Sequence, residues 1–178
     1  MSRPAKVTLE EWVDVGLNTL RHHGFSALKA DRLAKEKRVT RGSFYNNFNN
    51  VEDFYRAIIQ NWKEESSQKI ITQLDQLPSK RVALENLLYL SFGNNERLER
   101  QMRIWAENDP LPREAVAEVD NMRVTYLHRL LLENGVPSKN AITRANIIYD
   151  CYLGCSMRRR LSPQELERLV SDLMILCQ

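Results

Sequence analysis

A short segment, TRGSFYNNF from Thr40 to Phe48, concentrates side chains that form directional hydrogen bonds. An arginine such as Arg41 offers two parallel N–H donors that match the acceptors of guanine, and an asparagine amide pairs with adenine or contacts phosphate. Aromatic residues lie among these polar ones, although a loop in solvent has no need of rings. We therefore interpret the segment as a polar surface that faces a nucleic acid and is held in place by buried rings.

The residues around this segment predict two short helices joined by a tight turn. The first covers about Leu28–Lys37, and the second begins at a Thr40 cap and ends near Asn47. This arrangement is typical of a helix-turn-helix, whose second helix enters the major groove with its N-terminal residues toward the base edges. Phe44 and Phe48 are four residues apart and share one helical face, which we expect to pack against Leu33 and the first helix of the chain.

The stretch GFSALKADRLAKEKRVTRGSFYNNFNNVEDF resembles the DNA-binding region of the TetR family of transcriptional regulators. The family pattern reads Gly-Phe, Ile/Leu-Ala, Gly-Val-Ser-x-Gly-x-Leu-Tyr-x-x-Phe and Glu-Asp-Leu. The matching residues of this chain are Gly24-Phe25, Leu33-Ala34, Val39-Thr40-Arg41-Gly42, Phe44-Tyr45, Phe48 and Glu52-Asp53-Phe54.

The resemblance implies an all-α protein with two domains. Residues 1–50 would form an N-terminal three-helix helix-turn-helix domain that binds DNA. A long fourth helix would join it to a helical ligand-binding and dimerisation domain, residues 51–178. The residues expected to contact DNA are Lys29, Thr40, Arg41, Gly42, Ser43, Tyr45, Asn46 and Asn47.

The chain departs from the family pattern at three positions. Arg38 stands at the usual turn glycine and is expected to adopt another backbone shape or to bear a left-handed cost of roughly 1 kcal/mol. Val51 replaces a lysine often found at the start of the fourth helix, which removes one phosphate contact. Leu28 stands where threonine is common.

The positive charge of the chain is concentrated at its N-terminal end. Residues 1–50 hold nine Lys and Arg against five Asp and Glu, a balance of +4, whereas the remaining seventeen cations face eighteen acids. This distribution fits an anionic partner at the N-terminal end, although a basic end without a function remains an alternative.

The remaining composition favours a globular helical protein. Only six glycines and six prolines interrupt the chain, and 43% of its residues are hydrophobic. No signal peptide or membrane span is visible, and the three late cysteines do not form a disulfide framework. We expect a cytoplasmic protein with reduced thiols.

Capping signals and apolar periodicity delimit the helices. Thr8 to Glu11 and Ser162 to Glu165 read as capping boxes, and Gly24 as a helix stop. The segment NDPLP, Asn108–Pro112, is expected to be a rigid connection. Helices are expected over about 9–23, 28–37, 40–47, 51–77, 80–92, 96–107, 113–134, 138–160 and from Ser162 onward.

Other reactive residues give no catalytic pattern. No Ser-His-Asp set, paired-carboxylate cleft or phosphate loop is visible, so we expect neither an enzyme nor a cofactor or metal. Cys151 and Cys155, one helical turn apart, fit a thiol sensor, half of a soft-metal site, or core or interface packing, and packing is favoured. The run Arg158–Arg160 either contacts an acidic partner or complements a helix C-terminus, and we favour the second.

Two further sets of residues follow from the family resemblance and from the apolar pattern. The aromatic and methionine residues expected to line an effector pocket, although many such residues are plain core, are Trp62, Tyr89, Met102, Trp105, Tyr126 and Tyr149. The last helix has an apolar arc, widened by Ile175 and Leu176, that is broader than one packing face requires. The residues expected at a dimer interface are Cys155, Leu166, Leu169, Val170, Leu173, Met174 and Cys177.

These features predict a dimeric regulator that binds a near-palindromic operator and is released by a small molecule. Repression is the expected direction of control. The alternative is a helical interaction or adaptor protein with a vestigial helix-turn-helix, which the altered turn at Arg38 leaves open.

Overall fold

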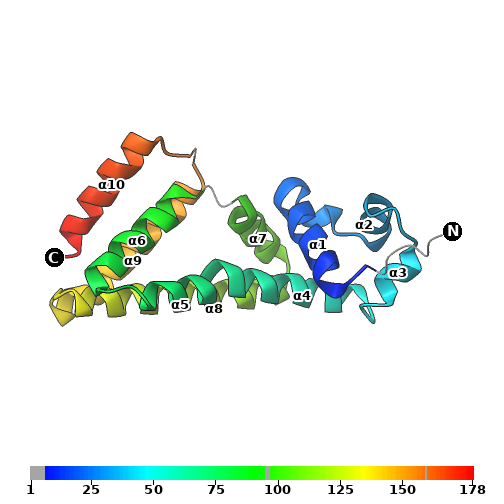
Figure 1. Cartoon of the computed structure of the whole chain (residues 1–178), viewed down its shortest axis with the longest axis horizontal. Coiled ribbons are helices and arrows are strands. Elements are labelled where there is room, and N and C mark those ends of the chain that lie inside the picture. Colours follow the sequence, from blue (N-terminus) through cyan, green and yellow to red (C-terminus); the bar gives the residue numbers. More distant parts are fainter. Residues whose placement is uncertain (1–6, 95–96, 159) are drawn as a thin grey trace. The chain divides into compact units, whose positions relative to one another are not determined.

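The computed structural model describes residues 7–94, 97–158 and 160–178, and every regular element within these ranges is helical (Figure 1). The all-α fold and its N-terminal helix-turn-helix are therefore as predicted. The chain divides into two compact units. Unit 1 comprises Met1–Glu64 and Arg97–Val116, and unit 2 comprises Glu65–Glu96 and Ala117–Gln178.

Unit 1 contains the helix-turn-helix together with a later helix. Helices α1, α2 and α3 gather around one end of α4, and α7 packs against α1 (Figure 1). The bounds are α1 (Leu9–His23), the short 3₁₀ helix η1 (Phe25–Ala27), α2 (Ala30–Glu36), α3 (Arg41–Tyr45), α4 (Val51–Lys63), α7 (Arg97–Asn108) and the first part of α8 (Pro110–Glu133).

Local signals at both ends position α1. The Thr8 hydroxyl accepts from the Glu11 amide at 3.2 Å, and the Glu11 carboxylate accepts from the Thr8 amide at 2.8 Å. At the other end Gly24 has a φ of 76°, which glycine adopts without steric cost. Between them Trp12, Val13 and Leu20 are buried. The predicted bounds and capping box of this helix are confirmed.

A glycine allows α1 to approach α4 closely. A Cβ atom placed on Gly16 would lie 2.6 Å from Ile58 Cδ1 and 2.7 Å from the Phe54 ring. Phe54 and Ile58 are both fully buried, so neither side chain has room to move aside. Gly16 is therefore required by packing.

We expect Gly16→Ala to lower the free energy of unfolding by about 1–3 kcal/mol, the usual cost of an overpacked core. Urea unfolding followed by circular dichroism measures the change. Gly42→Ala in α3 is the matched control, because a Cβ there would meet only the Thr40 hydroxyl oxygen, at an ordinary contact distance of 3.7 Å. The control should gain about 0.5–1 kcal/mol from helix propensity. Equal stability of the two variants would contradict this account of the α1–α4 contact.

The predicted rigid connection at NDPLP is wrong, because the structure continues almost directly from α7 into α8. Only Asp109 separates the two helices. Pro110 begins α8, where a proline is tolerated because the first N–H groups of a helix have no intrahelical acceptor. The Asp109 carboxylate accepts from the Leu111 amide and from Trp105 Nε1, and Arg113 donates to the carbonyls of Ala106 and Glu107.

Unit 2 is built from the remaining helices. Its elements are the π-helical segment η2 (Glu64–Gln68) from Glu65 onward, α5 (Lys69–Asp75), α6 (Lys80–Gly93), the later part of α8, α9 (Ser138–Ser156) and α10 (Pro163–Leu176). Helix α6 packs against α5, α9 and α10. The buried core includes Leu84, Leu88, Leu130, Ile148 and Leu173.

The predicted long helix over 51–77 is present but is not uniform. Its turns widen over Glu64–Gln68 and return to α geometry in α5. Arg123 of α8 holds this segment, since its guanidinium donates to the Ser67 hydroxyl at 3.0 Å and to the Ser66 carbonyl at 3.2 Å. The spacing of hydrophobic residues in the sequence does not reveal these wider turns. In the structure they occur where the segment contacts α8.

The ends of the last two helices differ in how well the sequence predicted them. Helix α9 stops at Ser156 rather than near Arg160. The capping box before α10 is confirmed: the Ser162 hydroxyl accepts from the Glu165 amide, the Glu165 carboxylate accepts from the Ser162 amide, and Pro163 occupies the first turn.

Candidate nucleic-acid interface

An aromatic cluster fixes α3 on the rest of unit 1. The Phe44 ring, which has no exposed surface, lies 5.4 Å from the Trp12 ring and 5.1 Å from both the Phe48 and the Phe54 rings. Phe48 is also buried. The expected burial of the two phenylalanines is confirmed, and their rings come from the same helical turn that carries the polar residues.

Most of the predicted DNA-contacting residues are on the surface. Lys29 is the N-cap residue of α2 and Thr40 is that of α3, and neither side chain makes a capping hydrogen bond. Ser43 is half-buried. The exposed members of the predicted set are Lys29, Thr40, Arg41, Gly42, Tyr45 and Asn46.

Arg41 is held by two neighbours on this surface. Its Nη2 donates to the Tyr45 hydroxyl at 3.2 Å, and its Nε lies 3.4 Å from Asp31 Oδ1 of α2. The Tyr45 hydrogen bond and the Asp31 carboxylate raise the pKa of Arg41. Sequence reasoning missed Asp31, because no spacing signal marks a contact between two different helices. All three side chains are exposed, so the guanidinium remains accessible to an anion.

Asn47 has a different role from its neighbour Asn46. Its amide donates to the Val7 carbonyl at 3.2 Å and to the Ser43 carbonyl at 3.0 Å. These bonds join the segment before α1 to the end of α3. The amide nitrogen of Asn47 is thus used within the fold, whereas Asn46 is exposed.

The turn between α2 and α3 places Arg38 in the left-handed region, with φ of 57°. The Val39 amide donates to the Ala34 carbonyl at 2.9 Å, and the Arg38 amide donates to the Lys35 carbonyl at 3.1 Å. This pair of bonds is a Schellman motif, in which the left-handed position usually holds glycine. From the sequence, Arg38 is expected either to adopt another backbone shape or to bear the cost of the left-handed conformation. The structure has the left-handed conformation.

We expect Arg38→Gly to raise the free energy of unfolding by about 0.5–1 kcal/mol, because relief of the left-handed conformation exceeds the added entropy of the unfolded chain. Lys37→Gly is the control, since Lys37 has φ of −74° and gains nothing from glycine. Chemical denaturation of both variants measures the difference. A less stable Arg38→Gly protein would contradict this reading of the turn.

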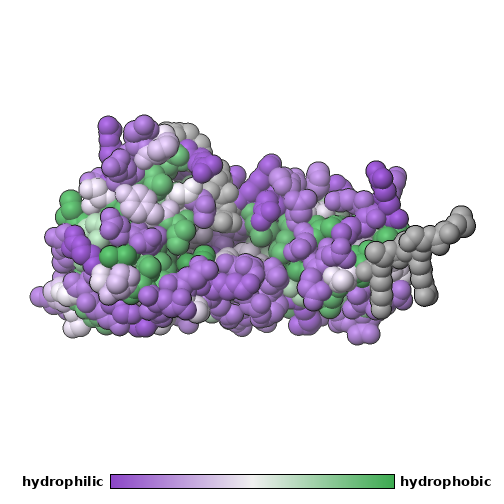
Figure 2. Space-filling view, viewed as in Figure 1, coloured by the Kyte–Doolittle hydropathy of each residue, from purple (hydrophilic) through white to green (hydrophobic). Residues whose placement is uncertain are grey.

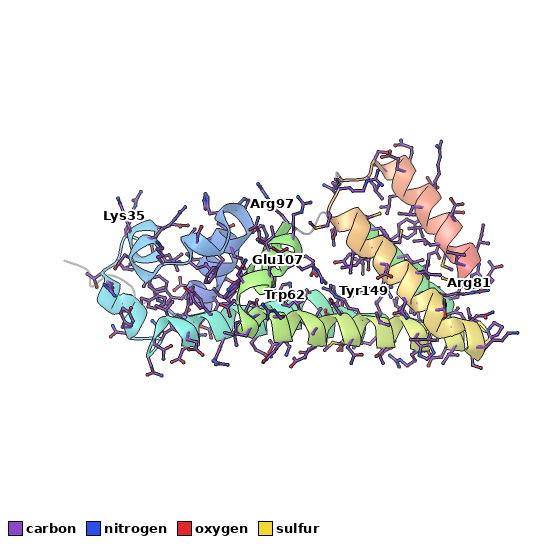
Figure 3. All side chains as sticks on the ribbon, turned by 180° about the vertical axis from the view of Figure 1, so that it is seen from behind. Lys35, Trp62, Arg81, Arg97, Glu107 and Tyr149 are labelled. Carbon is purple, nitrogen blue, oxygen red and sulfur yellow. The ribbon has the colours of Figure 1, made fainter. Side chains whose placement is uncertain are left out.

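The predicted effector residues of unit 1, Trp62, Met102 and Trp105, are all buried. Trp105 of α7 stacks on Phe25 with ring centroids 4.5 Å apart and meets Tyr55 of α4 edge-on at 5.2 Å. The Tyr55 hydroxyl donates to the Leu28 carbonyl at 3.1 Å, and burial followed by the Asp109 charge raises the pKa of Tyr55. Trp62 of α4, labelled in Figure 3, and Met102 of α7 are also buried.

The predicted effector residues of unit 2 do not form one group. Tyr89 is exposed on α6. The Tyr126 hydroxyl donates to Asp75, and burial together with that carboxylate raises the pKa of Tyr126 to about 12. Tyr149 donates to Asp120 at 2.6 Å. A small pocket between α6 and α9 is lined by none of the six predicted effector residues but by Ser91, Phe92, Asn94, Tyr152, Cys155, Ser156, Arg160 and Leu161.

The predicted dimer residues fall into two groups. Val170, Leu173 and Cys177 are buried inside unit 2, so they already pack against their own chain. Cys155, Leu166, Leu169 and Met174 are only partly buried. The exposed large apolar residues on the same two helices include Ile147 of α9, at 52%, and Ile175 and Leu176 of α10, at 65% and 42%. Figure 2 shows hydrophobic patches among polar residues over the α10 region.

Helices α9 and α10 meet at the C-terminal end of the chain. Arg144 of α9 donates to the carbonyls of Leu176 and Gln178. A Cβ on Gly154 of α9 would meet open space. Within the described parts of the chain, no helix has the length and apolar character needed to cross a membrane.

Sequence comparison finds no family model and no curated protein that matches the chain. Solved structures do match it. A TetR transcription regulator from Haloarcula marismortui has a TM-score of 0.75 at 17% identity, with 95% of each chain covered. Reduced NemR from E. coli has a TM-score of 0.74 at 18% identity, with 94% of this chain and 96% of that one covered.

A third match is a protein from Saccharomonospora viridis described as a transcriptional regulator, in complex with choline. Its TM-score is 0.72 at 10% identity, with 94% of this chain and 93% of that chain covered. The chain therefore has the fold of TetR-family transcriptional regulators over almost its whole length. This confirms at the level of fold the resemblance seen in the sequence around Thr40–Phe48.

Proposed function

We propose that this protein is a DNA-binding transcriptional regulator, acting as a repressor, with α3 as its recognition helix. The observation that carries the proposal is the division of side chains on α3. Phe44 is fully buried in the aromatic cluster, while Arg41, Tyr45 and Asn46 are exposed. A rigid helix that presents a cation, a phenol and an amide suits major-groove contact.

We assign different roles to the exposed residues. Arg41 reads a guanine through paired N–H donors, because its guanidinium stands at the N-terminal end of the helix. Tyr45 and Lys29 contact phosphates, which position the helix without reading sequence. Asn47 positions α3, because its side-chain amide donates hydrogen bonds to the carbonyls of Val7 and Ser43. Arg41, which is paired with Asp31 in the free protein, exchanges that carboxylate for DNA.

We propose that two copies pair through α9 and α10. Ile147, Gly154 and Leu176 form the centre of this surface, with Leu169 and Met174 beside them. The exposed apolar side chains and the open space at Gly154 support a close helix–helix contact. A two-fold pair also suits DNA, because two recognition helices must reach successive major grooves roughly 34–36 Å apart.

We propose that a small effector acts through α7. Trp105 contacts Phe25 of η1 and Tyr55 of α4, and Tyr55 in turn is bonded to Leu28 just before α2. A ligand that shifts α7 therefore displaces groups that support the helix-turn-helix. Release of DNA follows if the ligand prefers the shifted conformer. The choline complex of the similar S. viridis protein supports a ligand-binding role for this fold.

The experiment that tests the proposed function is selection of binding sites from random duplex DNA by the purified protein. The expected product is a near-palindrome with half-sites roughly one helical turn apart. A sequence without two-fold symmetry would count against the dimer, and the absence of any enriched sequence would count against the regulator.

A further inference from the structure

Two cysteine thiols lie together on α9. Cys151 and Cys155 are both partly exposed, are one helical turn apart and are reduced. Burial, and then the neighbouring Cys155 thiol to which it is hydrogen-bonded, raise the pKa of Cys151. The third cysteine, Cys177, is buried in the core of unit 2, and burial raises its pKa to about 11. Cys151 and Cys155 also pack against the core of unit 2, as the interpretation favoured from the sequence expects, but this packing leaves both partly exposed.

The helix holds these thiols at a spacing that suits a bridging ion better than a disulfide. Side chains four residues apart on a helix have Cβ atoms about 5–6 Å apart. A disulfide requires a Cβ separation of about 3.5–4.5 Å, so oxidation of this pair would distort α9. An ion between the two sulfur atoms lengthens the bridge and leaves the helix intact.

The surroundings limit which ion the pair can take. Among the residues that the structure describes, no group of three or more His, Cys, Asp or Glu side chains is placed to hold a metal. Zinc prefers four ligands in a structural site, whereas soft monovalent ions are satisfied by two thiolates. The pair therefore favours an ion of low coordination number.

A pocket gives access to one of the two sulfur atoms. Cys155 lines the small pocket between α6 and α9, together with Phe92, Tyr152 and Arg160. The pocket has a volume of about 10 Å³, which is close to the space that one water molecule needs. This size admits a single ion.

We propose that Cys151 and Cys155 bind one soft monovalent metal ion, of the Cu(I) and Ag(I) class, as a two-coordinate bis-thiolate. Each sulfur forms one bond to the metal and releases its proton to water, and no atom changes oxidation state. The product carries one net negative charge, which the positive Arg160 at the pocket stabilises. The site requires neither DNA binding nor the proposed dimer.

Silver ion is the probe, because Ag(I) is not oxidised in air. Native mass spectrometry of the full-length protein should show one tightly bound Ag(I) per chain and two fewer thiols accessible to a thiol reagent. Cys151→Ser and Cys155→Ser should each weaken Ag(I) binding by more than about 100-fold. Loss of a residue that only positions a metal ligand costs less than this, about 10–100-fold. Cys177→Ser is the matched control and should bind Ag(I) like the wild type.

Circular dichroism verifies that each variant is folded before the titration. Unchanged Ag(I) affinity in folded Cys151→Ser or Cys155→Ser overturns the site, as does a wild-type signal that is lost only in Cys177→Ser. Silver that appears only between two chains, bound by one cysteine from each, also overturns it. DNA binding measured without metal tests the regulator separately, so either proposal can fail alone.

Discussion

Gly154→Arg on α9 is expected to turn a dimer into monomers and to weaken operator binding by a factor on the order of 10³ or more, the margin that separates specific from non-specific binding. The open space around Gly154 in the protomer accommodates the new side chain, and arginine is a better helix former than glycine. The protomer should therefore remain folded. Loss of the partner then removes one of two half-site contacts.

Sedimentation at micromolar concentration measures the first effect. The wild type should have about twice the chain mass of 20.8 kDa, and the variant should have the chain mass itself. Thr125→Arg is the control, because it places the same charge on an exposed position of α8 outside the proposed surface. A Gly154→Arg protein that stays dimeric would remove α9 from the interface. A wild-type monomer with tight operator binding would refute the dimer altogether.

Arg41→Ala is expected to cost about 1–3 kcal/mol of operator binding and to relax the preference at one base pair. The reason is the paired geometry of the guanidinium, which an alanine cannot replace. Arg41→Lys separates charge from geometry: lysine keeps the positive charge but lacks the planar pair of donors, so the base preference should also be lost.

Asp31→Asn provides the opposite test of the same contact. It removes the carboxylate that lies 3.4 Å from Arg41 in the free protein, and it should strengthen binding at all sequences because one negative charge leaves the surface. Competition binding with single-base variants of the selected operator measures each effect. Arg41→Ala with unaltered affinity and unaltered base preference would mean that another helix reads the DNA.

The sequence predicted best those features that local chemistry determines. The first helix, its capping box and its glycine stop depend on Thr8, Glu11 and Gly24, and neighbouring residues contain all of that information. The same holds for the burial of Phe44 and Phe48, since helical spacing alone places the two rings on one face.

Features that depend on distant contacts were not predictable from local patterns. The π-helical turns at Glu64–Gln68 accompany bonds from Arg123, which is far away in the sequence. The pairing of Asp31 with Arg41 joins two helices. The apolar stripe on α10 gave no means of separating Leu173, which faces its own core, from Leu176, which faces outward.

The segment NDPLP illustrates a different limit. Two prolines in close succession usually indicate a break, yet both lie in the first turn of α8, where the missing N–H groups are not needed. The Asp109 carboxylate provides the cap that makes so short a joint possible. The same residues thus fit both a loop and a helix start, and only the tertiary contacts of Trp105 and Arg113 distinguish them.

The most direct test of the central proposal is the affinity of the wild-type protein for the selected operator and for a scrambled duplex, measured by fluorescence anisotropy from about 50 to 200 mM salt. If α3 reads DNA, binding to both duplexes should fall steeply with salt, and the operator should be preferred by a factor on the order of 10³ or more. Equal binding to the two duplexes, or no binding to either at the lowest salt, would contradict the proposal that this chain is a sequence-specific DNA-binding regulator.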